Sequence, residues 1–198
     1  MENYGYSLGK HISVVSAEFR VPKNVHLRIA KRHSGATDDF VVTDEKGNIV
    51  FEVVGKFFSL HNRHVLVDDR GTSILTFKKK NLSAHKRWQA YNGDGSNNRD
   101  LLFSARTSSL IQFKTEVDIF LPTNKEETSW DFKVIGSWLE KSCTIYNKDS
   151  TPIAKMHKKH TFGCIFDKDT FEVAIYPNVD RAFIVTLVVI IHEMNKDY

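Results

Sequence analysis

Cationic side chains gather in one short stretch of the sequence, between residues 78 and 87. The stretch contains four lysines and one arginine, which are Lys78, Lys79, Lys80, Lys86 and Arg87. Several cations at a corner between two strands can hold a phosphorylated head group through charge-assisted hydrogen bonds. Lysine is also a common guard of exposed sheet edges, and the residue types alone favour this second interpretation. We therefore treat the stretch as a candidate anion-binding site with a structural alternative.

A second basic segment follows at residues 155–160, with the sequence KMHKKH. It could line the same face as the first segment, or it could end a strand, and the sequence leaves both interpretations open. On the first interpretation, Lys158 and Lys159 join the candidate ligand-binding residues. The two segments together would then favour a ligand that carries phosphate or another anionic group.

Zinc is the metal to consider, because His157, His160, Cys143 and Cys164 are residue types that bind it. Their spacing does not support a structural zinc site, and the sequence has no C-x-x-C pair. We therefore predict no metal site. Cys143 lies in a segment where apolar and polar residues alternate, and we interpret it as a small core residue.

Catalytic motifs are absent from the sequence as well. It contains no serine nucleophile elbow, no phosphate-binding P-loop and no glycine pattern of the dinucleotide-binding type. Paired acids occur at Asp68-Asp69 and at Glu126-Glu127, but both pairs fall in predicted turns, where exposure to solvent explains them. We therefore predict a protein that is not an enzyme and that needs no cofactor.

The composition is that of an ordinary globular domain. Of the 198 residues, 41% are hydrophobic and 26% are charged, which argues against disorder and suits one domain with a sizeable core. The net charge of +4 and the pI near 9.0 favour anionic partners, although the excess is small. Nucleic acid is a poorer candidate than a membrane surface, because no recognition helix is evident.

The N-terminal residues lack the basic start and the continuous apolar run of a signal peptide. Two cysteines do not make the disulfide framework of a small secreted protein either. We therefore expect a cytoplasmic protein. We also expect residues 1–20, which have little hydrophobic pattern, to form a weakly structured N-terminal segment.

The elements that would position the candidate residues are β-strands. The segments FVVTDEKGNIVFEV and HVLVDDRGTSILTF, which start at residues 40 and 64, repeat one design at a distance of 24 residues. Each places a glycine, Gly47 or Gly71, where a tight turn between two strands needs a positive φ. The repeat predicts two successive hairpins in one sheet, and it explains the recurring Ser, His and Arg residues at the hairpin corners without catalysis.

Further strand candidates occur along the whole chain. Each is short and mixes apolar with polar residues, and they cover residues 21–29, 87–91, 101–105, 110–113, 117–121, 130–135, 142–146, 153–157 and 170–176. Many short strands at regular spacing imply a sandwich or a barrel. Closure into a barrel would also remove the exposed edges of the sheet.

The C-terminal segment AFIVTLVVII, residues 182–191, is nearly all apolar. Burial of its eight large side chains is worth on the order of 12–24 kcal/mol, so the segment must lie inside the protein, and it is too short to span a membrane. Its β-branched residues favour a strand, whereas Asn178 and Asp180 before it can cap a helix. The residues alone leave helix and strand open, with a slight preference for a helix.

Several longer segments together resemble the plant LURP-one-related proteins. They include GSWLE at residues 136–140 and YPNVD at residues 176–180, and the similarity runs from about residue 22 to residue 195. The family is similar to the C-terminal domain of tubby-like proteins and to phospholipid scramblases. The resemblance implies that residues 21–198 form one closed antiparallel β-barrel of about twelve strands, tubby C-terminal-like, around a hydrophobic helix at about residues 180–195.

The resemblance also implies a role in plant defence against pathogens and, by analogy of fold, binding of phosphoinositides; it supplies no catalytic residues. Two function hypotheses follow. The first is a monomeric module that binds anionic phospholipid head groups through the basic residues above, at the plasma membrane or in association with the nucleus. The second is a protein-interaction scaffold in defence signalling that uses the loops at residues 92–98 and 124–128 and has no lipid ligand.

Overall fold

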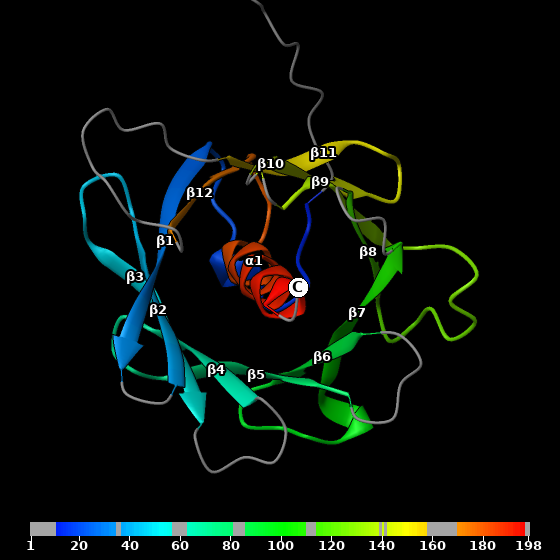
Figure 1. The fold of residues 1–198 in the computed structure, drawn as a ribbon, viewed down its shortest axis with the longest axis horizontal. Coiled ribbons are helices and arrows are strands. Elements are labelled where there is room, and N and C mark those ends of the chain that lie inside the picture. Colours follow the sequence, from blue (N-terminus) through cyan, green and yellow to red (C-terminus); the bar gives the residue numbers. More distant parts are fainter. Residues whose placement is uncertain are drawn as a thin grey trace, which may run out of the picture.

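In a computed structural model of the chain, antiparallel strands form a closed barrel around one α-helix (Figure 1). The structure describes residues 11–34, 37–56, 63–80, 86–109, 114–138, 140, 142–157 and 170–196. Within these residues there are twelve strands, which are β1 (Val25–Ser34), β2 (Thr37–Thr43), β3 (Ile49–Lys56), β4 (Arg63–Asp68), β5 (Ser73–Lys79), β6 (Arg87–Asn92), β7 (Leu101–Ser109), β8 (Thr115–Phe120), β9 (Phe132–Ser137), β10 (Ser142–Asn147), β11 (Pro152–His157) and β12 (Thr170–Ile175). The helices are η1 (Ala17–Phe19), η2 (Asn98–Asp100) and α1 (Arg181–Asn195).

The order of the strands in the barrel follows their order in the sequence. Each strand pairs antiparallel with the next one along the chain, and β1 pairs with β12 from Val25 opposite Ile175 to Ala30 opposite Thr170. This last pairing closes the sheet, so the barrel has no open edge. The prediction of a closed antiparallel β-barrel is confirmed.

Side chains alternate between the inside and the outside of the barrel along each strand. In β12, for example, Phe171, Val173 and Ile175 are buried, and the residues between them are only half-buried. This alternation is the pattern by which the strands are recognised in the sequence. All the predicted strands have counterparts in the structure except residues 110–113, which lie outside the described residues.

The predicted pair of repeated hairpins is present. The turn between β2 and β3 contains Gly47 with φ +84°, and the turn between β4 and β5 contains Gly71 with φ +80°, the left-handed region that glycine favours. In each turn an aspartate side chain, that of Asp44 or Asp68, accepts two backbone N–H groups. The corners that carry the recurring serine and histidine residues lie outside the described part of the chain.

Helix α1 lies in the middle of the barrel, and Figure 1 shows it end-on within the ring of strands. Every residue from Ala182 to Met194 is buried. Phe183 packs against Phe103 of β7 and Phe132 of β9, with ring centroids 5.1 and 4.9 Å apart. The prediction of a central helix at about residues 180–195 is therefore confirmed.

The backbone explains why this segment is a helix although its residues favour a strand. A single strand inside a barrel would have no partner for its N–H and C=O groups, whereas a helix bonds them internally. The β-branched residues then cost only about 0.5 kcal/mol each in helix propensity. The hydroxyl of Thr186, the polar residue of the run, donates to the carbonyl oxygen of Ala182 at 2.8 Å, so it too has a partner.

The start of the helix is fixed by Asp180, whose side chain is fully buried. Its Oδ1 accepts the N–H of Phe183 as a helix cap, and its Oδ2 accepts three N–H groups from residues 14–16 at 2.7 to 3.1 Å. Burial raises the pKa of this carboxyl, and the four N–H donors oppose the rise. Residues 11–20 are therefore anchored, which differs from the expectation of a weakly structured segment 1–20; residues 1–10 lie outside the described residues.

Helix α1 is short in comparison with the thickness of a bilayer. It has 15 residues, whereas a membrane-spanning helix needs about 20. Within the described ranges, no helix has the combination of length and hydropathy that a membrane crossing requires. The expectation that the apolar C-terminal segment is buried in protein agrees with the burial of residues 182–194.

Val188 lies in the middle of α1 and is only 1% exposed. We expect Val188→Asp to unfold the domain, because an unpaired carboxylate in the core costs an amount comparable with the whole stability of a domain, about 5–15 kcal/mol. Thermal unfolding followed by circular dichroism measures the effect. Ile49→Asp is the matched control and should fold, because Ile49 is 46% exposed. A folded Val188→Asp variant with the wild-type melting temperature would contradict the central position of the helix.

Candidate anion-binding site

The barrel end at which α1 stops is rich in cations, and we call it the basic end. Lys86 marks this end, since its Nζ donates to the carbonyl oxygen of Met194 in the last turn of the helix. The cationic residues at the strand ends and helix end here are Lys31, Arg32, Arg63, Lys78, Lys79, Lys80, Lys86, Arg87, Arg106, Lys114 and Lys196. Among the described residues, the acids at this end or in contact with these cations are fewer, namely Asp38, Asp39, Glu52, Glu116, Glu127, Glu140 and Glu193.

The opposite end, where α1 begins, has a different charge. The turns at residues 44–47 and 68–71 lie at this end, and each contains two acids and one base. Because the strands form an antiparallel meander, every second connection lies at the same end of the barrel. Connections that follow one another in the sequence therefore lie at opposite ends of the barrel, and the basic and the acidic connections are separated along the barrel axis.

Three of the predicted ligand-binding residues form the lysine triad, Lys78, Lys79 and Lys80, at the basic end of β5. Lys78 lies on the outside of the barrel with its Nζ 5.0 Å from the ring centre of Tyr91. Lys78 and Lys79 are half-buried, and Lys80 is exposed. The triad is therefore accessible from solvent at the rim of the barrel.

The other predicted residues are placed differently. Lys86 is used by the fold, because its ammonium satisfies a carbonyl at the C-terminus of α1, at 3.0 Å, where the helix dipole also favours a cation. Lys158 and Lys159 lie outside the described residues. Of the predicted set, the structure thus brings the triad together with Lys86 and Arg87 at one end.

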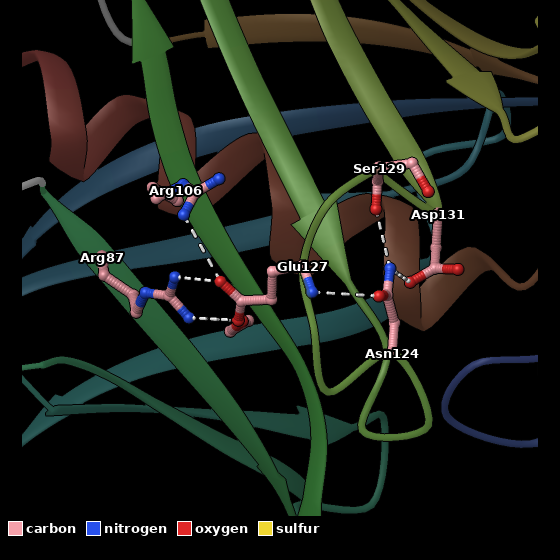
Figure 2. Close-up of polar contacts among 7 residues, drawn as sticks. Arg87, Arg106, Asn124, Glu127, Ser129 and Asp131 are labelled. Carbon is pink, nitrogen blue, oxygen red and sulfur yellow. Dashed lines mark hydrogen bonds and ion pairs between the residues drawn. The ribbon is translucent and has the colours of Figure 1, made fainter.

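Arg87 forms the most extensive polar contact of the predicted set. Two of its nitrogens donate to the two carboxylate oxygens of Glu127 at 2.6 and 2.5 Å (Figure 2). Arg106 contacts the same carboxylate at 3.4 Å, and Arg87 also donates to the hydroxyl oxygen of Ser104 at 3.2 Å. The hydrogen bonds from Arg87 lower the pKa of Glu127. The prediction that exposure to solvent explains the Glu126-Glu127 pair is wrong for Glu127.

Strand pairing brings the two arginines together. Arg87 of β6 and Arg106 of β7 are opposite each other in the sheet and lie on the same face. Their guanidinium groups lie over the ring of Phe120, 5.9 and 4.8 Å from its centre. Sequence reasoning missed Arg106 because its partner lies on another strand, and only the register of the two strands reveals the pair.

The loop at residues 121–131 carries Glu127 to the arginines. Asp131 holds the base of this loop, since its Oδ2 accepts the N–H of Leu121 and the side-chain amide of Asn124, both at 2.9 Å. Asn124 in turn accepts the N–H of Glu127 at 3.2 Å (Figure 2). Glu127 has φ +48°, an uncommon value for a residue other than glycine. The loop is thus a defined structure, although its sequence resembles a simple polar turn.

A second polar cluster closes the basic end beside the helix. Lys196 contacts the carboxylates of both Asp38 and Glu193, and Lys31 lies 2.9 Å from Asp38. One donor atom each of Asp38, His192 and Glu193 lies within 4.8 Å of the others, an arrangement that suits a metal ion. The ammonium of Lys196, however, already supplies a positive charge to both carboxylates. Sequence reasoning missed this cluster because Asp38 and Lys196 are 158 positions apart.

The residues considered for zinc do not come together in the described part of the chain. Cys143 is buried in β10, and burial raises the pKa of its thiol to about 12. His157 is at the end of β11, where its Nε2 lies 3.7 Å from a carboxylate oxygen of Glu172. Cys164 and His160 lie outside the described residues. The interpretation of Cys143 as a core residue agrees with its burial.

A closed meander of twelve described strands around an apolar C-terminal helix defines a class of β-barrel domains. A crystal structure of a protein from Arabidopsis thaliana has this fold, with a TM-score of 0.74 and 36% sequence identity. The similarity covers 93% of this chain and 99% of that one.

The family is defined by the sequence comparisons. The family model described as LURP-one-related matches residues 25–192, and the chain belongs to this family. Protein LURP-one-related 15 of Arabidopsis thaliana is 44% identical over 187 residues, which are 93% of this chain and 86% of that protein. Protein LURP1 of the same plant is 40% identical over 186 residues, with 92% and 90% covered. The resemblance found in the sequence is confirmed.

The cluster around Asp38 makes a prediction about stability in acid. Burial raises the pKa of Asp38, but the hydrogen bonds from Lys196 and Lys31 outweigh it and bring the pKa from 3.8 to about 2. The stabilising effect of Asp38 is therefore complete above the unfolded-state pKa and is lost as the pH falls toward 2. We expect Asp38→Asn to be less stable than wild type near pH 6, by about 1 kcal/mol or less because solvent screens the pair.

Urea unfolding of both proteins between pH 2 and pH 7 measures this difference. It should shrink as the pH falls below 4 and should be mostly lost by pH 2, where about half of the Asp38 carboxyls are protonated in the folded protein. A difference that stays constant over the whole range would show that the ion pairs of Asp38 do not contribute to stability.

Proposed function

We propose that this protein is a non-enzymatic binding module that attaches its basic end to anionic phospholipid head groups during defence against pathogens. The observation that carries the proposal is the separation of charge between the two ends of the barrel, with the lysine triad at the rim of the basic end. The defence role is proposed from the family, in which Protein LURP1 is a relative. A cytoplasmic protein associated with the plasma membrane or the nucleus would meet such head groups.

Physical magnitudes support a membrane surface as the target. Each lysine or arginine close to an anionic leaflet contributes about 1 kcal/mol, so a triad can contribute about 3 kcal/mol. The remaining cations of the basic end add to the same field, whereas the acidic turns are at the far end of the barrel. A monomer can therefore present one charged end to the membrane and keep its acidic turns away from it.

The ionisable groups of the described residues support a role without catalysis. Those with a shifted pKa are explained by an ion pair, a turn or burial: Glu127 by Arg87, Asp44 by the backbone of its turn, and Cys143 by the core. Such shifts can mark catalytic groups when a reactive partner lies beside them. Here each of these groups has a structural partner or a structural environment, and the proposal needs no cofactor.

Vesicle sedimentation tests this proposal. We expect the protein to bind phosphatidylcholine vesicles that contain phosphatidylserine or phosphatidylinositol bisphosphate, and to bind pure phosphatidylcholine weakly. Binding should weaken as salt shortens the Debye length from about 10 Å at 0.1 M to about 3 Å at 1 M. The variant Lys78→Glu/Lys79→Glu/Lys80→Glu should lose at least about a hundredfold in affinity, because three attractive charges become repulsive.

The matched control is Lys46→Glu/Arg70→Glu/Lys148→Glu, which makes the same change of charge at three exposed positions at the opposite end. This control should keep most of the binding if the basic end faces the membrane. Equal losses of vesicle affinity in the two variants would show that binding depends on the net charge of the protein and not on the basic end. Binding that does not depend on salt or on anionic lipid would refute the proposal.

A protein-interaction scaffold in defence signalling is the second candidate. It is favoured by the defined structure of the two predicted contact loops. The loop at residues 92–98 is held by the hydroxyl of Thr76, which donates to the carbonyl oxygen of Gly93 at 2.8 Å, and the loop at residues 124–128 is held by Asn124. Preformed loops lose little conformational freedom on binding. If the protein binds none of the vesicles, and substitutions in these two loops abolish its binding to a partner protein, it is such a scaffold.

A further inference from the structure

The arginine pair on the outside of the barrel carries more positive charge than its carboxylate partner neutralises. Arg87 and Arg106 lie opposite each other on neighbouring strands, an arrangement that destabilises a sheet unless an anion lies between the two charges. Lys80 is bonded through its backbone N–H to the carbonyl oxygen of Arg87, and its charge adds to the positive field at Glu127. Three cations therefore act on one carboxylate.

We propose that Arg87 and Arg106 form a binding site for a phosphoryl group, and that Glu127 holds this site as an internal stand-in for the phosphate. Guanidinium groups bind carboxylate and phosphate oxygens in the same two-point geometry. A phosphate monoester carries a charge of about −1.5 to −2 at pH 7, so it matches three cations better than a single carboxylate does. The charge of Lys80 is shared with the lysine triad, but the two guanidinium groups that would hold the phosphoryl group are outside the triad and do not depend on membrane attachment.

The two guanidinium groups are held in place by contacts other than Glu127. Both lie over the ring of Phe120, which is itself 2% exposed and therefore fixed. Arg87 is also oriented by its hydrogen bond to Ser104 at 3.2 Å. These contacts would keep the arginines in position when Glu127 leaves, so a phosphoryl group would meet a prepared site.

Glu127 can be exchanged without unfolding its loop. The base of the loop is held by Asp131 and Asn124 through bonds that do not involve the carboxylate of Glu127 (Figure 2). The side chains of Glu127 and Arg106 are 24% and 29% exposed, so a ligand can reach the site from solvent.

Other acids near the site are already paired with lysine. Asp118 lies opposite Arg106 on β8, but its carboxylate is 3.6 Å from the ammonium of Lys133. Lys133 also contacts Glu116 at 3.2 Å, so these three residues form a neighbouring network of their own. Glu127 is therefore the acid whose removal exposes the arginine pair.

The test compares three variants by isothermal titration with inorganic pyrophosphate at constant ionic strength. Glu127→Gln should bind pyrophosphate more tightly than wild type, by about tenfold or more, because the internal competitor no longer lowers the fraction of open sites. Glu126→Gln makes the same change of charge at the neighbouring exposed residue and should bind like wild type. Arg106→Gln/Glu127→Gln should lose the gain.

Two results would overturn the proposal: equal affinity of Glu127→Gln and Glu126→Gln, or a gain that persists in the double variant. Binding to vesicles with phosphatidic acid, whose head group is a phosphate monoester, distinguishes a lipid head group from a soluble phosphate compound as the ligand. A gain of Glu127→Gln for pyrophosphate and for these vesicles assigns the site to a lipid head group. A gain for pyrophosphate alone assigns it to a soluble phosphate compound.

A measurement on the wild-type protein keeps the test independent of the folding of the variants. In a nuclear magnetic resonance titration, pyrophosphate should shift the side-chain N–H signals of Arg87 and Arg106 and the backbone amide signal of Glu127. The vesicle experiment reports on the lysine triad, whereas this titration reports on the two guanidinium groups in the wild-type protein, so failure of membrane binding and failure of this site give different results. Signals of the two arginines that do not change at saturating pyrophosphate would refute the proposal.

Discussion

The removal of one helix from water is the constraint on which the rest of this structure depends. Helix α1 is apolar on every side, so it must be covered on every side, and a closed barrel is the architecture that does this with a single sheet. The backbone of the helix bonds internally and needs nothing from the barrel except at its two ends. Asp180 serves the first end, and Lys86 serves the last.

A filled interior determines where binding chemistry can occur. The inward residues of the strands pack against α1, so the inside of the barrel is mostly apolar core, with buried polar exceptions such as His64 and Thr186, and most of the described polar side chains are on the rims and the outer face. The antiparallel meander then sorts alternate connections to opposite ends, which concentrates cations where the helix stops. The candidate sites of this protein are therefore surface sites, held by strand register and by loops that fold back on the barrel.

Local features of the structure could be predicted from the sequence, since they depend on neighbouring residues. The two hairpins with Gly47 and Gly71 follow from a repeat, and most strands follow from alternating residues. Propensity could not distinguish a helix from a strand at residues 182–191. The helix is favoured because it bonds its own backbone groups, whereas a single strand inside the barrel would leave them without partners. The family resemblance identified it, and the structure confirms it.

The polar contacts could not be predicted because they join distant parts of the chain. Arg87 and Glu127 are 40 positions apart, and the loop at residues 121–131, which contains Glu127, must fold back over the strands before the two side chains meet. A triplet of lysines is visible in any sequence, but the partner of a single arginine is not. The basic stretch at residues 78–87 therefore contains residues with different roles: Lys86 is bonded to the end of the helix, Arg87 to the loop, and Lys78 lies over the ring of Tyr91.

The pairing of β1 with β12 has a consequence for how the chain becomes folded. β1 cannot complete its pairing until β12 has been synthesised, and the helix that fills the barrel is synthesised after both strands. Contacts of such long sequence separation give a high contact order, which slows folding. During synthesis the earlier hairpins can form, but they emerge from the ribosome without the helix that covers their apolar faces. Completion of this barrel is therefore a late event that requires the last two elements of the domain, and the partly synthesised domain is the form most exposed to aggregation.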